Sequence, residues 1–331
     1  MSTPHQTIIS PLSVPYQSYM PKTPCYAPDQ TQERFLYLFR GQIVIWTPDL
    51  DSLSKIFSGL VENPSLASFP RRIILSPRRR DSMKDTAELF ASLDALKVRL
   101  DAHCPLSPDV VSQIREDMRI RFTYHSNAIE GNTLTMSETK AVLADGITIG
   151  GKSLREHLEA VGHSHAIDYL EALVQRDEAL TERTLREIHN LILRNIDGAN
   201  AGTYRRMNVL ISGAGHIPPP AERVPERMDA FFQWYGAARD RMHPVEFAAR
   251  VHADFVNILH PFKDGNGRTA RLIMNFELMR AGFPTVIIPV ESRPAYYQNL
   301  DVIATQGNYS PFIIQIAELA KQGFAPLLGP C

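Results

Sequence analysis

The sequence predicts a mainly α-helical fold with one small β-hairpin and a small accessory region on its N-terminal side. Apolar residues recur at helical spacing along most of the chain after Ser82. Helix start signals precede several of these segments, the strongest being Ser107-Pro108-Asp109, where an N-cap residue is followed by proline. The helical period is broken at 205–220, where VLI, SGAG and HIPPP are typical of a hairpin with a rigid, extended exit.

The first hundred residues divide by composition. Residues 1–33 are rich in Pro, Ser, Thr and Gln and are expected to be disordered. The apolar segment Arg34–Trp46 predicts one or two strands in an accessory region that spans 34–105. The basic stretch Pro70–Ser82 is interpreted as a solvated linker, because two prolines break it and no aromatic residues are interleaved.

The helical part begins near Ser82, and the helix opened by Ser107 should stop near Gly131-Asn132. The helical spacing of apolar residues places the later helices. They are expected at Ser137–Ala144, Leu154–Gln175, Arg183–Arg194, Pro225–Ala238, Pro244–Leu259, Gly267–Ala281 and Ser310–Lys321.

Composition favours a folded soluble protein and gives no global charge signal. The 331 residues are 44% hydrophobic and 21% charged, with 35 Lys and Arg against 36 Asp and Glu. Neither nucleic acid nor a membrane is therefore an expected partner. Three scattered cysteines suggest no disulfide framework or zinc site. No secretory pattern or run of about 20 apolar residues is present, so the cytosol, with the nucleus included, is the expected compartment.

The segment His260–Arg271, HPFKDGNGRTAR, carries the strongest chemical signal. It joins two helical segments, so the N–H groups that open the second helix should face the loop and favour an anion. Arg268 and Arg271 are three apart and can converge on phosphate oxygens. Asp264 is a hard ligand of the kind that Mg²⁺ takes together with substrate phosphates. His260 is the natural general base near neutral pH, and Asn266 can donate to a phosphate oxygen. The pattern indicates attack of a hydroxyl on a nucleotide phosphate.

Two other interpretations of this segment are a plain glycine turn and a calcium loop. The calcium loop fails on spacing, because Thr269 stands where its glycine belongs and Asn275 where its glutamate belongs. A plain turn does not usually combine His, Asp, Asn and two Arg within 12 residues. Lys263 and Thr269 are expected to be exposed and without a role.

This segment resembles the HPFx[DE]GNGRxxR signature of Fic-domain proteins at every defining position. The resemblance extends over residues 110–325 and includes GTYR at Gly202–Arg205, the predicted hairpin and the helices on either side of the motif. It implies a Fic-type helical bundle whose hairpin is a flap that pins an extended segment of the target by strand addition. The implied flap residues are Val209, Leu210, Ile211 and Ser212.

The resemblance also implies roles for the motif residues. His260 would deprotonate a Ser, Thr or Tyr hydroxyl of a target protein, and Asp264 would hold Mg²⁺ against the phosphates of ATP. Phe262 would be a buried anchor. The implied nucleotide-binding residues are Gly265, Asn266 and Gly267 as an anion hole, Arg268 and Arg271 on the β- and γ-phosphates, and Tyr296 and Tyr297 beside the adenine. Where some relatives have an asparagine on the adenine, this chain has Ala304-Thr305.

The segment Ser126–Asn132, SNAIEGN, resembles the [ST]xxxE[GN] inhibitory motif of Fic proteins with an N-terminal inhibitory helix. Taken alone it is a helix end with a glycine stop, and Glu130 could merely be solvated. With the resemblance, Glu130 and Ser126 become regulatory residues. A bidentate Glu130–Arg271 ion pair would keep that arginine from the γ-phosphate.

The expected function is therefore that of a protein adenylyltransferase, which uses Mg²⁺ and ATP to place AMP on a protein hydroxyl and is restrained by Glu130. Alternatives are removal of AMP with Glu130 orienting water, transfer of another group such as UMP, and a non-catalytic ATP-sensing scaffold. A homodimer is a further expectation. The expected organisation is an inhibitory helix region at 106–150 and a catalytic domain at 151–325.

Overall fold

The computed structural model describes residues 35–39, 42–46, 77–103, 107–211 and 215–329. The chain divides into two compact units, Met1–Ile74 and Leu75–Cys331. The described part of the first unit is a two-stranded antiparallel sheet, β1 (Phe35–Phe39) and β2 (Gln42–Trp46), in which Phe35 pairs with Trp46 and Tyr37 with Val44. The strands predicted within Arg34–Trp46 are thus confirmed.

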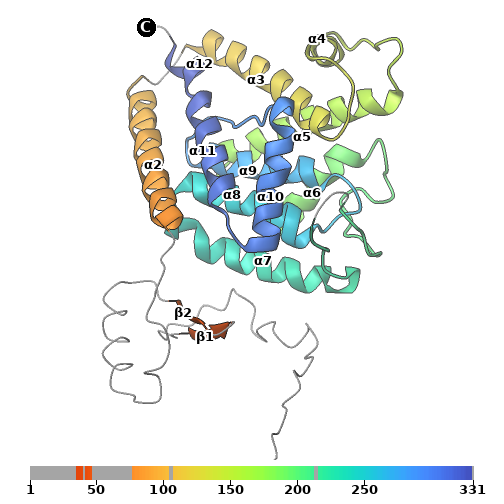
Figure 1. Cartoon of the computed structure of the whole chain (residues 1–331). Helices are drawn as coiled ribbons and strands as arrows, with labels where there is room; N and C mark the ends of the chain where they lie inside the picture. The colour runs from red at the N-terminus through yellow and green to blue at the C-terminus, as the bar shows by residue number, and fades with distance from the viewer. Residues whose placement is uncertain (1–34, 40–41, 47–76, 104–106, 212–214, 330–331) are drawn as a thin grey trace, which may run out of the picture. The chain divides into compact units, whose positions relative to one another are not determined.

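The second unit is helical, and its order of elements agrees with most of the sequence-based expectation (Figure 1). No helix among the residues that the structure describes is long and apolar enough to cross a membrane. The helices are α2 (Pro77–His103), α3 (Pro108–Ile129), α4 (Met136–Lys140), α5 (Leu154–Gln175), α6 (Glu182–Leu193), α7 (Val224–Ala238), α8 (Pro244–Ala253), α9 (Asn266–Arg280), α10 (Arg293–Gln306), α11 (Ser310–Gly323) and α12 (Ala325–Leu328), with π-helical turns at Ala141–Asp145 and Asp254–Leu259 and 3₁₀ turns at Ala221–Arg223, Arg239–Arg241 and Val290–Ser292.

Local chemistry sets the start and stop of the helices that frame the site. Ser107 caps α3 by accepting a hydrogen bond from the backbone N–H of Val110, with Pro108 in the first turn. The same helix stops before Gly131, whose φ of 101° is easily reached only by glycine. Ser153 caps α5, and Glu156 completes a reciprocal capping box there. The C-terminal end of α3 and the N-terminal end of α5 are therefore fixed by local contacts.

Helix α9 is the centre of the helical unit, and α3, α5, α6 and α8 all pack against it (Figure 1). Its residues Leu272, Ile273, Met274 and Phe276 are fully buried on different sides of the helix. A helix buried all round keeps its N-terminus fixed by the core. The HPFKDGNGRTAR segment joins α9 at this N-terminus, so packing of α9 in the core fixes the C-terminal end of the loop.

Three expectations about individual segments differ from the structure. Helix α2 begins at Pro77, so the end of the expected linker Pro70–Ser82 is helical, consistent with proline in a first helical turn. Helix α10 was not expected, although Tyr296, Leu300 and Ile303 on it are buried at helical spacing. At 205–220 the described residues form no strand pairs, because Pro218, Pro219 and Pro220 have no N–H to give to a ladder.

The expected division of the chain stays a prediction. Residues 1–33 lie outside the described residues. Helix α2 lies in the compact unit Leu75–Cys331 and packs against α11, so part of the expected accessory region 34–105 belongs to the helical unit.

Candidate active site

His260 stands at an irregular helix end that fixes its ring. The helix α8 widens into a π-helical turn, Asp254–Leu259, and His260 follows it with φ 43° and ψ 57°, a left-handed conformation that is costly for a residue other than glycine. Its Nδ1–H donates to the carbonyl of Val256 at 2.8 Å. Because Nδ1 carries the proton, Nε2 keeps its lone pair. Burial also lowers the pKa of His260, so the ring is a neutral base at pH 7.

The loop after His260 is closed by Asn266. Its Oδ1 accepts from the N–H of Phe262 at 3.0 Å, and its Nδ2 donates to the carbonyl of Phe262 at 2.8 Å. Phe262 is fully buried and stacks on His189 of α6, with ring centroids 3.5 Å apart. The side chain of Asn266 is thus engaged in shaping the loop.

His189 holds the loop from the other side. Gly202 N–H donates to its Nδ1, and its Nε2–H donates to the carbonyl of Asp264, both at 2.9 Å. Burial lowers the pKa of His189 to about 4, so the ring is neutral and this donor and acceptor assignment holds at pH 7. Gly265 has φ 75° and forms the N-cap of α9. The free N–H groups of the first turn of α9 therefore open toward the loop, as an anion site requires.

Arg271 and Glu130 form the ion pair that the sequence led us to expect. Arg271 is 1% exposed and its Nη2 donates to Glu130 Oε1 at 2.7 Å. The same guanidinium donates to Ser126 twice, from Nε to the hydroxyl at 3.0 Å and from Nη2 to the carbonyl at 2.8 Å. The end of α3 thus takes the Nε and Nη2 donors of Arg271, and the pair with Glu130 has one hydrogen bond instead of the expected two.

The Glu130 carboxylate also lies against the backbone at the N-terminus of α9. A Cβ atom added to Gly267 would be 2.2 Å from Glu130 Oε1. A side chain larger than glycine's at position 267 would require the Glu130 carboxylate to move away from this turn. An internal carboxylate therefore lies where the helix N-terminus and Arg271 together favour an anion.

Tyr296 and Tyr297 lie in different environments on α10. Tyr296 is 1% exposed, and its hydroxyl accepts from Arg271 Nη1 at 3.3 Å and donates to His252 Nε2 at 3.0 Å. Burial lowers the pKa of His252 far enough to keep it neutral. Tyr297 is 41% exposed. Tyr296 therefore supports Arg271, and Tyr297 has the accessible ring of the two.

The expected flap is tied to the active-site loop by Arg205. This buried side chain donates to the carbonyls of His260 at 2.9 Å and Met207 at 3.1 Å, and also to the carbonyl of Pro219. Leu210 is 79% exposed, whereas Val209 and Ile211 are half-buried. Ser212 lies outside the described residues.

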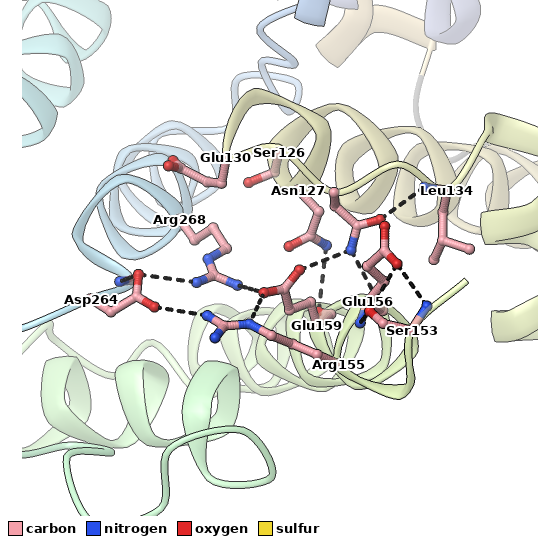
Figure 2. Close-up of polar contacts among 12 residues, drawn as sticks. Ser126, Asn127, Glu130, Leu134, Ser153, Arg155, Glu156, Glu159, Asp264 and Arg268 are labelled. Carbon is pink, nitrogen blue, oxygen red and sulfur yellow. Dashed lines mark hydrogen bonds and ion pairs between the residues drawn. The ribbon is translucent and has the colours of Figure 1, made fainter. Parts of the chain in front are cut away.

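Asp264 and Arg268 meet two side chains of α5 that the sequence did not single out. Arg268 Nη2 is 3.5 Å from Asp264 Oδ1, and Arg155 Nη2 is 3.2 Å from Asp264 Oδ2 (Figure 2). Glu159 lies between the two arginines (Figure 2). Only the four-residue spacing of Arg155 and Glu159 was visible in the sequence, and that spacing is common on solvated helices.

The structure thus brings together His260, Asp264, Arg268, Arg271 and Glu130. Thr269 was expected to be exposed and is fully buried, because the first turn of α9 enters the core directly; Lys263 is exposed and pairs with Asp197. No sequence pattern had indicated a role for His189, Arg205, Arg155 or Glu159. Of these only Arg205 had a signal, as the last residue of GTYR.

The fold and this loop define a helical domain built around the N-terminus of α9, whose geometry suits an anion. The Fic/DOC family model matches residues 179–278. The structure is similar to residues 134–508 of Fic-1 from C. elegans, with a TM-score of 0.67 and 33% identity over 75% of this chain and 74% of that one. It is also similar to a Fic domain containing signaling protein from Bacteroides thetaiotaomicron, with a TM-score of 0.64 and 30% identity over 70% of this chain and 95% of that one.

The chain belongs to the Fic/DOC family. Among curated relatives, the protein adenylyltransferase Fic of Nematostella vectensis is 44% identical over 60% of this chain and 46% of its own length. The protein of the same name from Drosophila melanogaster is 34% identical over 76% of this chain and 52% of its own length. The chain spans about half the length of the curated relatives it matches.

Proposed function

We propose that this chain is a protein adenylyltransferase that transfers AMP from ATP to a Ser, Thr or Tyr hydroxyl of a target protein. The observation that carries the proposal is the meeting of a neutral imidazole and two buried arginines around the N-terminus of α9. His260 keeps Nε2 unprotonated, and Arg268 and Arg271 are 2% and 1% exposed. The curated relatives named protein adenylyltransferase support the same reaction.

In this reaction the target hydroxyl oxygen attacks the α-phosphorus of ATP. The bond between that phosphorus and the oxygen bridging to the β-phosphate breaks, and pyrophosphate leaves. The hydroxyl proton goes to His260 Nε2, whose ring is held by Val256 while the proton moves. Arg268, Arg271 and the first-turn N–H groups of α9 hold the phosphates in line.

The donor set near the loop fits one magnesium ion. Asp264 has a half-exposed carboxylate at the mouth of the loop, beside the phosphate cradle. Among the residues that the structure describes, no three His, Cys, Asp or Glu cluster as a complete metal cage. Mg²⁺ commonly uses one or two carboxylates and takes its other ligands from water and phosphate, so a single aspartate is sufficient. When bound, Mg²⁺ supplies charge neutralisation on the phosphates.

Glu130 acts as a brake on this transfer. Its contact with Arg271 at 2.7 Å and its place against Gly267 support competition with the terminal phosphate for the same cradle. Ser126 contributes because its hydroxyl accepts a hydrogen bond from Arg271 Nε and so keeps the guanidinium next to Glu130. ATP that enters while Glu130 remains has its α-phosphate out of line for attack.

The target protein docks on the segment around Leu210. Leu210, Met207 and Ile217 are exposed apolar side chains at 79%, 60% and 78%. In this segment the described residues form no strand pairs, which supports docking of a peptide that adds as a strand. Tyr297 borders the adenine with its accessible face. A homodimer and the domain boundaries at 105 and 150 remain predictions.

The test is incorporation of labelled AMP into proteins of a lysate. Glu130→Gly protein with Mg·ATP should label target chains, while the double variant with His260→Ala should label none. Chelation of Mg²⁺ or Asp264→Ala should remove labelling as well. ATP binding by Glu130→Gly without any labelling would overturn the transferase and favour an ATP-sensing scaffold.

A second candidate activity is hydrolytic removal of AMP from a modified protein. Glu130 is 34% exposed, and its charge acts on His260, whose pKa it raises against the larger effect of burial. A carboxylate at that position can orient water toward the phosphorus. Incubation of wild-type protein with AMP-modified target would release AMP if this direction operates, and Glu130→Gly would stop the release.

A further inference from the structure

Helix α5 supplies a carboxylate to the phosphate side of the site. Glu159 Oε1 lies 3.7 Å from Arg268 Nη1 and accepts from Arg155 Nε at 3.0 Å (Figure 2). Its other oxygen, Oε2, accepts from Asn132 Nδ2 at 2.9 Å. Two charged or amide donors therefore fix both oxygens of Glu159, and the side chain is 13% exposed.

Arg268 is buried with unused hydrogen-bonding capacity. Its side chain is 3% exposed, and Nε and Nη1 make no hydrogen bond to the residues that the structure describes. Its one hydrogen bond, from Nη2 to Asp264 Oδ1, is long at 3.5 Å. Leaving buried donors unpaired is unfavourable, so the guanidinium is prepared for an acceptor that comes from outside the chain.

The distances separate two kinds of carboxylate beside the two arginines. Glu130 is at 2.7 Å from Arg271 and takes one of its donors. Glu159 is at 3.7 Å from Arg268, beyond hydrogen-bond range but within ion-pair range. The first carboxylate competes with a phosphate, whereas the second attracts the cation and leaves its donors free.

We propose, on the basis of the proposed function, that Glu159 is a positioning residue that holds Arg268 ready for the polyphosphate of the nucleotide. Fixed by Arg155 and Asn132, it keeps the guanidinium plane oriented while no nucleotide is bound. Asn132 ends the inhibitory segment, so the same carboxylate joins that segment to the phosphate arginine. Binding of nucleotides with two or three phosphates therefore depends on Glu159, whereas binding of adenosine does not.

The experiment uses the full chain with Glu130→Gly as parent. Glu159→Gln keeps the shape and removes the charge, and Glu159→Ala removes the carboxylate. Glu171→Gln is the matched control, since Glu171 also lies on α5 and pairs with an arginine, Arg115, but on a surface away from the loop. Dissociation constants for Mg·ATP, ADP and adenosine are measured by calorimetry, and KM and kcat by labelled AMP transfer.

Both Glu159 variants should bind Mg·ATP and ADP about 10-fold more weakly, because about one oriented charge-assisted contact between Arg268 and the phosphates is lost. The KM for ATP should rise, whereas kcat and the affinity for adenosine should stay nearly unchanged. The control should match the parent. Unchanged or tighter ATP binding by Glu159→Gln would overturn the proposal, and so would equal weakening for adenosine, which indicates a general structural role.

The two proposals fail in different ways. A Glu130→Gly parent that binds Mg·ATP but transfers no AMP overturns the transferase and leaves the Glu159 comparison decisive through binding alone. A parent that binds no nucleotide overturns both. If Glu159→Ala does not fold, as judged by its circular dichroism, the isosteric Glu159→Gln carries the test.

Discussion

Replacing Glu130 by glycine should raise the rate of AMP transfer about 10- to 100-fold. The contact that is lost is the charge-assisted hydrogen bond from Arg271 Nη2 at 2.7 Å. Such bonds contribute roughly 1.5–3 kcal/mol, and about 1.4 kcal/mol corresponds to a tenfold change in population. Because Glu130 is 34% exposed, water screens the pair and the upper end of that range does not apply. Glycine is also compatible with the helix end that Glu130 occupies.

The assay is the initial rate of labelled-AMP incorporation at saturating Mg·ATP. Glu130→Gln serves as the control, since its neutral amide keeps the shape and a weaker hydrogen bond and should give an intermediate rate. The thermal midpoint of Glu130→Gly should rise more on addition of Mg·ATP than that of the wild type, because ATP no longer displaces an internal anion. Equal transfer rates for wild type and Glu130→Gly would refute the brake.

Three further outcomes follow from the geometry. The rate of AMP transfer by Glu130→Gly should stay constant as the pH falls from 7 to the ordinary histidine pKa of about 6.5 and should decline only at lower pH, because the neutral ring of His260 is the base and burial lowers its pKa. An inflection of the rate above pH 6.5 would contradict this. Asn266→Ala should lower the thermal midpoint, measured by differential scanning fluorimetry, by roughly 4–16 °C, because it leaves the buried N–H and carbonyl of Phe262 unpaired. An unchanged midpoint would show that the Asn266 side chain does not stabilise the loop. Gly267→Ala adds a methyl group whose carbon would be 2.2 Å from Glu130 Oε1, in the space proposed for the phosphates, so the double variant Glu130→Gly/Gly267→Ala should transfer AMP at least about 10-fold more slowly than Glu130→Gly. Full activity of the double variant would show that the phosphates bind elsewhere.

The parts of the site that could be predicted from sequence are those whose residues are close along the chain. His260, Asp264, Arg268 and Arg271 fall within 12 residues, and Arg268 and Arg271, three apart, lie on one side of the same helix by helix geometry alone. The Ser126–Glu130 segment was recognised only through a resemblance, and its pairing with Arg271 spans 141 positions. Contacts of that range depend on the packing of α3 against α9, which periodicity does not encode.

The supporting residues escaped prediction for the same reason. His189 contacts Asp264 across 75 positions, and Arg155 contacts it across 109. Each sits on a helix whose local pattern is ordinary. The π-helical turn before His260 was equally hidden, because it extends a helix that the apolar spacing correctly placed at Pro244–Leu259. The candidate reacting groups could thus be predicted from the sequence, whereas the side chains that orient them could be found only in the fold.

The Glu130–Arg271 contact bears both on the stability of the site and on the proposed inhibition. Arg271 is 1% exposed, and a buried guanidinium requires an anion or a set of acceptors to offset its lost hydration. Glu130 and Ser126 provide these in this structure, and in the proposed reaction a phosphate of ATP takes the place of Glu130. A variant without Glu130 should therefore be both more active and less stable until nucleotide is added. Glu159 differs because it neutralises Arg268 from 3.7 Å without taking its donors, so it can stay in place when the phosphates arrive. In the proposed reaction Glu130 therefore leaves Arg271 when nucleotide binds, whereas Glu159 stays beside Arg268.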